Sequence, residues 1–175
     1  MRAKKRHGQP GQLSPTCQGV RSARPKGWET RFPERVMKMV KRILVADDNP
    51  SMLDILDCFL TREGYLVDTA PGVFEALAAM ASNEYQIMLL DKNMPGSEGE
   101  RDGGIELLRR VHSMPLRSRV IMMTGSPTVG SLAELFSLGA QDLVYKPFSL
   151  LELGQRIKRA LLQPDAANRA DFCAG

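Results

Sequence analysis

The sequence predicts an α/β fold, in which five consecutive strand–helix units build a doubly wound, five-stranded parallel sheet. From residue 41 onward, short apolar runs alternate with stretches whose apolar residues recur every three or four positions, the pattern of repeated strand and helix units. The short runs are apolar at consecutive positions, which is typical of strands buried on both faces. Strands that alternate with helices usually pair in parallel through right-handed crossovers.

The first unit begins with a predicted strand at residues 43–46. Asn49 is a favourable N-cap and Pro50 suits the first helical position, so a helix is expected to begin there. Gly64 is a natural end for it, because glycine readily adopts the left-handed conformation that follows many helices. The apolar residues on its inward face are Met52, Leu56, Phe59 and Leu60.

The second, third and fourth units repeat this plan. Their strands are expected at residues 65–67, 87–90 and 120–123. Their helices are marked by apolar residues at helical spacing, namely Val73, Leu77 and Met80, then Ile105, Leu108 and Val111, then Val129, Leu132, Leu135 and Phe136. Gly139 is expected to end the last of these helices.

The fifth unit has a strand at residues 143–145. Ser149 and Glu152 have the spacing of a capping box, in which each side chain accepts a hydrogen bond from the other residue's backbone N–H. The helix that follows has Leu153, Ile157 and Leu161 on one face.

Polar residues interrupt the apolar runs at the carboxyl ends of four of the five strands. The first strand leads into Asp47 and Asp48, the third into Asp91, the fourth into Thr124 and the fifth into Lys146. Each alone has a plain structural explanation, such as a helix cap or a strand end. Because parallel strands end at one edge of the sheet, where open α/β folds bind ligands, the combination predicts a binding site.

The three aspartates predict a metal ion at this edge. Carboxylates at short distance repel one another and raise each other's pKa unless a positive charge compensates. Mg²⁺ favours a few carboxylates together with water and phosphate oxygens. Asp91, alone at its strand end, is then the expected nucleophile toward phosphorus. Lys146 would supply a second positive charge, and the Thr124 hydroxyl can donate to a phosphoryl oxygen.

These residues resemble the receiver domains of two-component response regulators, a family that includes the CheY-like chemotaxis proteins. The resemblance covers residues 41 to about 163. It rests on the strings VADDNPS at 45–51, LDKNMPG at 90–96, MTG at 123–125 and GAQDLVYKPF at 139–148. It implies a flavodoxin-like sheet with strand order 2-1-3-4-5, an order that the alternation of strands and helices leaves open.

The resemblance also assigns roles to residues. Mg²⁺ would be held by Asp48, Asp91 and the carbonyl of Asn93, with Asp47 helping through water. Asp91 would accept a phosphoryl group from a histidine kinase or a histidine phosphotransfer protein. The domain would then act by changing its contact with a downstream target protein, as a phosphoacceptor and not as a turnover enzyme. A cis Lys146–Pro147 peptide is implied as well.

Two departures from the family pattern are visible. Leu143 stands where the family usually has an aromatic switch residue, while an aromatic appears at Tyr145. The signal is therefore expected to leave through repacking of the face of the fourth helix. The second departure is a connection at 96–104 that is about five residues longer than the pattern. It is either a lid or kinase-selectivity element, or a solvated loop, since lengthening a loop costs little entropy.

Composition divides the chain of 175 residues, 43% of them hydrophobic, into three parts. Residues 1–40 hold ten Lys/Arg against two Asp/Glu and lack apolar periodicity, so they are expected to form a disordered basic extension. A receiver domain is expected at 41–163 and a short tail at 164–175, so the receiver is expected to act without an effector domain. Three scattered cysteines and the lack of an apolar run of roughly 20 residues suit a cytoplasmic protein without a membrane span.

Two other functions remain open from the residues. A phosphohydrolase of the haloacid dehalogenase type would also use an aspartate nucleophile, but it needs a second aspartate two residues later, where this chain has Asn93. A DNA-associated regulator would use the basic arm at 1–40 for salt-dependent contact with phosphates. The receiver pattern favours neither, and a nucleic-acid partner is not expected.

Overall fold

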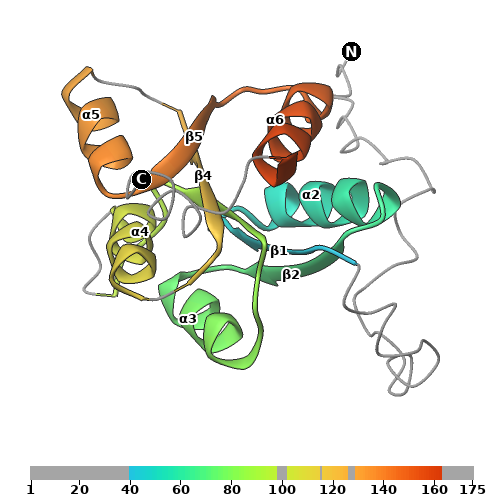
Figure 1. The fold of residues 1–175 in the computed structure, drawn as a ribbon, viewed down its shortest axis with the longest axis horizontal. Helices are drawn as coiled ribbons and strands as arrows, with labels where there is room; N and C mark the ends of the chain where they lie inside the picture. The colour runs from blue at the N-terminus through green and yellow to red at the C-terminus, as the bar shows by residue number, and fades with distance from the viewer. Residues whose placement is uncertain (1–39, 98–101, 115, 126–128, 163–175) are drawn as a thin grey trace, which may run out of the picture.

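The computed structural model describes residues 40–97, 102–114, 116–125 and 129–162, with the side chains of 129–131 left aside. Five parallel strands form one sheet in the order β2-β1-β3-β4-β5 (Figure 1). The strands are β1 Arg42–Ala46, β2 Leu66–Ala70, β3 Ile87–Asp91, β4 Arg119–Thr124 and β5 Ala140–Tyr145. The predicted fold class and strand order are thus confirmed.

Helices cover both faces of the sheet. They are α2 Pro50–Arg62, α3 Val73–Ser82, α4 Gly103–Ser113, α5 Val129–Ser137 and α6 Leu150–Leu162. In Figure 1, α2 and α6 lie together on one side of the sheet, and α3, α4 and α5 lie on the other. Every strand is followed by a helix. Because the crossovers are right-handed, the reversal of strand order at β1 places these helices on both faces of the sheet.

The side chains of each strand alternate between two hydrophobic cores. Ile43 and Val45 of β1 pack beneath α2 and α6, whereas Leu44 and Ala46 pack beneath α3, α4 and α5. All four are fully buried. Burial on both faces explains why these strands are apolar at consecutive positions, and it fixes the sheet as a rigid support for the residues at its ends.

The predicted helix ends are observed at two helices. The side chain of Asn49 accepts hydrogen bonds from the backbone N–H groups of Ser51 (3.0 Å) and Met52 (3.3 Å) at the start of α2. Beyond its end, Gly64 has a φ of 91°, a conformation that other residues rarely adopt. Gly139, after α5, has a φ of 92°.

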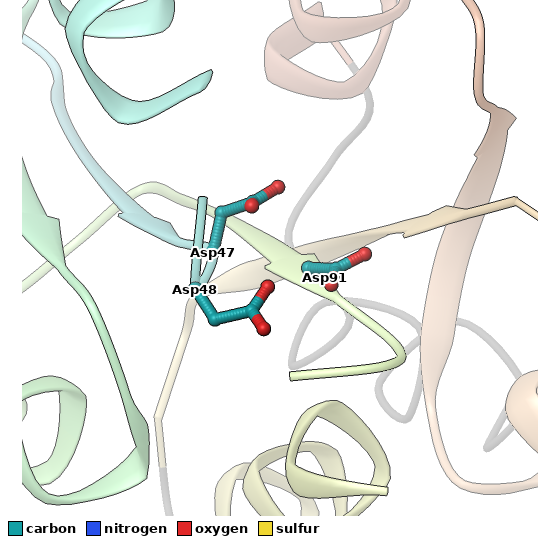
Figure 2. A group of neighbouring side chains, drawn as sticks. All are labelled: Asp47, Asp48 and Asp91. Atoms are coloured by element: carbon teal, nitrogen blue, oxygen red, sulfur yellow. The ribbon is translucent and has the colours of Figure 1, made fainter. Parts of the chain in front are cut away.

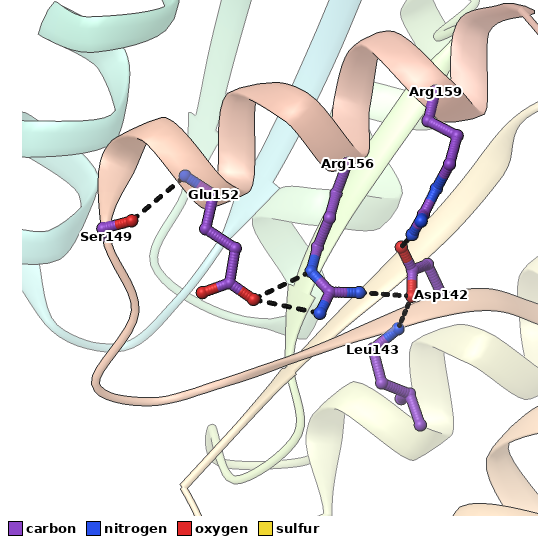
Figure 3. Close-up of polar contacts among 6 residues, drawn as sticks. All are labelled: Asp142, Leu143, Ser149, Glu152, Arg156 and Arg159. Carbon is purple, nitrogen blue, oxygen red and sulfur yellow. Dashed lines mark hydrogen bonds and ion pairs between the residues drawn. The ribbon is translucent and has the colours of Figure 1, made fainter.

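The capping box at α6 is only half formed (Figure 3). The Ser149 hydroxyl accepts from the backbone N–H of Glu152 (3.1 Å), as predicted. The Glu152 carboxylate, however, accepts from Arg156 one turn later, at 2.9 and 3.1 Å. Arg156 also donates to Asp142 of β5 (2.8 Å), so the carboxylate expected to cap the helix instead belongs to an ion-pair network between α6 and β5.

Leu135 and Phe136, two of the apolar residues that mark α5 in the sequence, differ in exposure. Leu135 is buried, but Phe136 is half exposed, because adjacent residues on a helix point in different directions. The predicted extension and the tail at 164–175 lie outside the described residues, apart from Val40. Within the described ranges, no helix is long and apolar enough to cross a membrane.

Candidate functional site

Asp47 and Asp48 follow β1 directly, at the carboxyl edge of the sheet. The backbone N–H of Asp47 donates to the carbonyl of Ala70 at the end of β2 (3.2 Å). One carboxylate oxygen of Asp47 accepts from the backbone N–H of Asn49 (2.9 Å), which fixes the turn into α2. As a result, Asp47 is fully buried, whereas Asp48 is exposed.

Asp91 is the last residue of β3, the strand next to β1. It lies beside Met123 of β4 and is 5% exposed. One carboxylate oxygen from each of Asp47, Asp48 and Asp91 lies within 4.8 Å of the other two. Figure 2 shows the three side chains gathered where β1 and β3 end. The sequence prediction that these carboxylates share one place is therefore met by the geometry.

Lys146 follows β5 and reaches across the edge of the sheet to the carboxylates. Its backbone N–H donates to the carbonyl of Thr124 (2.8 Å), and its peptide bond to Pro147 is cis. Its ammonium Nζ lies 2.6 Å from Oδ2 of Asp47 and 3.0 Å from Oδ1 of Asp91. A single ammonium thus faces two buried carboxylates, with a third nearby.

The pKa values of Asp91 and Lys146 are both shifted by their burial and by their charged neighbours. Burial raises the pKa of the Asp91 carboxyl most strongly, Lys146 lowers it, and the charges of Asp47 and Asp48 raise it again, so that it stays above its ordinary value. Burial by itself would lower the pKa of Lys146, but its hydrogen bonds to Asp47 and Asp91 outweigh this and raise it. The opposite effects of Lys146 and of the neighbouring carboxylates on the Asp91 carboxyl thus come from groups crowded at one edge of the sheet.

The geometry suits a divalent cation. Two oxygens bound to the same Mg²⁺ lie at most about 4.2 Å apart, twice the usual Mg–O distance. The three carboxylate oxygens, within 4.8 Å of one another, need to move by less than about 1 Å to meet that limit. Negative charge left uncompensated by Lys146 would favour such an ion.

The remaining predicted residues are placed less completely. Thr124 ends β4 and is buried, next to Tyr145 of β5, so its hydroxyl belongs to the same edge of the sheet. Asn93 is exposed in the turn two residues after Asp91. Its carbonyl oxygen stays a predicted ligand, because no contact in the described structure places it among the carboxylates.

Two glycines at the start of α4 support Asp91, a contact that sequence reasoning missed. A Cβ on Gly104 would collide with the Asp91 carbonyl, and a Cβ on Gly103 would lie 2.5 Å from the Pro95 carbonyl. The backbone of α4 therefore touches the strand end that carries Asp91. The adjacent pair Gly103-Gly104 at a helix start was the available signal, because glycine there often marks close approach of two backbones.

The two positions that depart from the family pattern differ in exposure. Leu143 is buried in the core beneath α3, α4 and α5, whereas Tyr145 is 43% exposed on β5 beside Thr124. Signalling through the α5 face remains a prediction. Residues 98–101 of the long connection lie outside the described structure. Its role as a lid or kinase-selectivity element therefore stays a prediction.

Comparison with known proteins gives a consistent result. The family model described as the response regulator receiver domain matches residues 43–158. Among curated proteins, the transcriptional regulatory protein ResD of Bacillus subtilis is 33% identical over 120 residues, covering 69% of this chain and 48% of ResD. The uncharacterized transcriptional regulatory protein YkoG of the same species is 34% identical over 121 residues, covering 69% of this chain and 51% of YkoG. The chain thus spans about half the length of these relatives.

Some solved structures are matched over almost their whole length. The CheY-like receiver domain protein of Methanospirillum hungatei is 30% identical, with a TM-score of 0.64, covering 70% of this chain and 94% of that one. The response regulator TrrA of Thermotoga maritima, solved in complex with Mg²⁺ and BeF, is 32% identical with a TM-score of 0.60. This match covers 69% of the present chain and 99% of TrrA.

Proposed function

The chain belongs to the response regulator receiver domain family of two-component signal transduction, and we propose that within it Asp91 accepts a phosphoryl group at a Mg²⁺ site. The observation that carries this proposal is the cluster of Asp47, Asp48 and Asp91, in which the buried Asp47 and Asp91 pair with the Lys146 ammonium. Asp91 combines the burial, the strand-end position and the cationic neighbour expected of a carboxylate nucleophile. The related TrrA binds Mg²⁺ with BeF, which supports the same ion here.

Asp48, Asp91 and the Asn93 carbonyl would hold the ion, with Asp47 assisting through water. When bound, Mg²⁺ supplies positive charge that offsets the charge of the phosphoryl oxygens. A carboxylate oxygen of Asp91 then attacks phosphorus, the bond from phosphorus to the donor breaks, and the donor leaves with that electron pair. Lys146 already lies 3.0 Å from Asp91 and would stabilise the charge on the transferred group, while the Thr124 hydroxyl donates to one of its oxygens.

The donor in the cell would be a histidine kinase or a histidine phosphotransfer protein. The aspartyl phosphate would shift a two-state equilibrium of the domain and so change its contact with a downstream target protein. The domain then acts as a phosphoacceptor switch and not as a turnover enzyme. The phosphohydrolase alternative is not favoured, because Asn93 occupies the position of the required acid. The DNA-associated alternative is not favoured either, because the family match covers residues 43–158 and does not include the basic arm.

Intact-mass spectrometry tests the proposal. After incubation with acetyl phosphate and Mg²⁺, the wild type should gain the mass of one phosphoryl group. Asp91→Ala, and the wild type with EDTA, should gain none. A wild type that stays unmodified, or an Asp91→Ala variant that is modified as readily as the wild type, would refute the assignment of Asp91.

A further inference from the structure

The segment from Lys92 to Ser97, which follows Asp91 and carries Asn93, is held to the rest of the domain at three points. The backbone N–H of Lys92 donates to the carbonyl of Met123 in β4 (2.8 Å). The Met94 side chain is fully buried, and the Met94 carbonyl accepts from the N–H of Gly103 (2.9 Å). The third point is Ser97, at the far end of the segment.

Ser97 is held by both carboxylate oxygens of Glu106, in the first turn of α4. Its backbone N–H donates to Oε2 (2.9 Å) and its hydroxyl donates to Oε1 (2.7 Å). We name this pair of hydrogen bonds the Ser97 clamp. The backbone N–H of Ser97, and next its hydroxyl, lower the pKa of the Glu106 carboxyl, so the clamp holds a charged carboxylate.

The Ser97 clamp spans the connection that is longer than the family pattern. It joins Ser97, near the start of that connection, to Glu106 in the first turn of α4. A longer connection restrains its ends less, because more conformations are open to it. Two hydrogen bonds to one carboxylate restore that restraint at Ser97, four residues from Asn93.

The first turn of α4 links the Ser97 clamp to the predicted metal site. Gly104, two residues before Glu106, packs directly against the Asp91 carbonyl. The turn that supports Asp91 is thus the same turn that holds Ser97. Glu106 also accepts from Arg110 at 2.9 Å, an ordinary pair one turn apart on the helix surface, which by itself would give Glu106 no link to the site.

We propose that Glu106 is a positioning residue, which acts through Ser97 to hold the segment 92–97 in the conformation that presents Asn93 to Mg²⁺. This inference rests on the proposed phosphorylation of Asp91. Loss of the clamp should weaken Mg²⁺ binding and leave the chemistry at saturating Mg²⁺ nearly unchanged. Glutamine at 106 should preserve the clamp, because its amide can accept from the N–H of Ser97 and donate to the hydroxyl.

The test measures the rate of phosphorylation by acetyl phosphate against Mg²⁺ concentration. Glu106→Ala should raise the Mg²⁺ concentration for half-maximal rate by about three- to tenfold, the size of the net contribution of one ordinary hydrogen bond, with the maximal rate within about twofold of wild type. Glu106→Gln should restore the wild-type Mg²⁺ dependence. Ser97→Ala should give a smaller shift, and its combination with Glu106→Ala should add little, since both remove one interaction.

Two further measurements separate positioning from general damage. Hydrogen–deuterium exchange without Mg²⁺ should be faster at 92–97 in Glu106→Ala and unchanged in Glu106→Gln. Arg110→Gln removes the other partner of Glu106, keeps the clamp, and should match the wild type in both assays. A Glu106→Ala variant with wild-type Mg²⁺ dependence, or an Arg110→Gln variant shifted equally, would overturn the inference alone. A wild type that takes no phosphoryl group would overturn the proposed function as well.

Discussion

At the amino end of the sheet, Arg42 donates to Asp68 (3.1 Å) and to Asn83 (2.6 Å), and the buried Tyr85 hydroxyl donates to the same Asp68 oxygen (2.9 Å). At the carboxyl end, Asp47, Asp48 and Asp91 lie close together, and the ammonium of Lys146 pairs with Asp47 and Asp91. At the amino end, the Arg42 guanidinium balances the charge of the Asp68 carboxylate, and the Tyr85 hydroxyl adds a neutral donor. At the carboxyl end, three carboxylates lie beside one ammonium, so negative charge is left uncompensated.

The difference separates a stabilising network from a functional one. Buried polar groups that find partners support a fold, whereas like charges held close together oppose it and persist where a ligand or a reaction needs them. The amino end should therefore contribute to stability without affecting phosphorylation. The carboxyl end should cost stability in the absence of Mg²⁺ and be needed for phosphorylation.

The largest expected change in stability is at the amino end. Arg42→Met removes the guanidinium that pairs with the Asp68 carboxylate, and the side chains of Arg42 and Asp68 are only 18% and 27% exposed. The free energy of unfolding should fall by about 2 to 3 kcal/mol, which urea denaturation would measure. Phosphorylation by acetyl phosphate at saturating Mg²⁺ should keep its wild-type rate. A large loss of that rate in a folded variant would contradict the assignment of the amino end of the sheet to stability alone.

A change of opposite sign is expected at the carboxyl end. Asp91→Asn removes one of the crowded carboxylates, and in Mg²⁺-free buffer the free energy of unfolding should rise by about 1 to 2 kcal/mol. Adding Mg²⁺ should stabilise the wild type more than the variant, because the ion binds the folded wild type more tightly. Thermal denaturation with and without Mg²⁺ measures both effects. A less stable variant in Mg²⁺-free buffer would mean that Lys146 compensates the charge fully.

The smallest expected change is at Tyr85, and it depends on pH. Burial, and then the hydrogen bond to Asp68, raise the pKa of Tyr85 from 10.0 to about 12. Tyr85→Phe should lose about 1 kcal/mol of stability at neutral pH. The wild type should lose this advantage as the pH rises from 10.0 through about 12, because the unfolded chain ionises the phenol first. An advantage that stays constant over that range would show that folding does not raise the pKa of Tyr85.

The residues that meet at the carboxyl end of the sheet could be predicted from the sequence, whereas the contacts at its amino end could not. Asp91, Thr124 and Lys146 could be placed together because each ends a recognisable apolar run, and parallel strands end at one edge. Arg42 begins its strand and Asp68 lies within β2, where the period of a strand gives no hint of a polar partner. Their contact depends on which strands are neighbours, and that order came from the family resemblance.

Contacts that depend on the path of a loop were also beyond the sequence. The distance of nine residues between Ser97 and Glu106 is not one at which a helix or strand brings side chains together. Glu152 shows the same limit at a shorter range. Its spacing from Ser149 fits a capping box, but Arg156 one turn later offers the carboxylate a charged donor, which outcompetes a backbone N–H.

Chemical identification of the phosphorylated residue tests the account most directly. Borohydride reduces an aspartyl phosphate to homoserine, so peptide mass spectrometry after treatment with acetyl phosphate, Mg²⁺ and borohydride can locate the modified side chain. We expect homoserine at position 91 in the wild type and in Arg42→Met, and none when Mg²⁺ is withheld. Homoserine at another aspartate, or none in the presence of Mg²⁺, would contradict the assignment of the carboxyl end as the phosphoryl site.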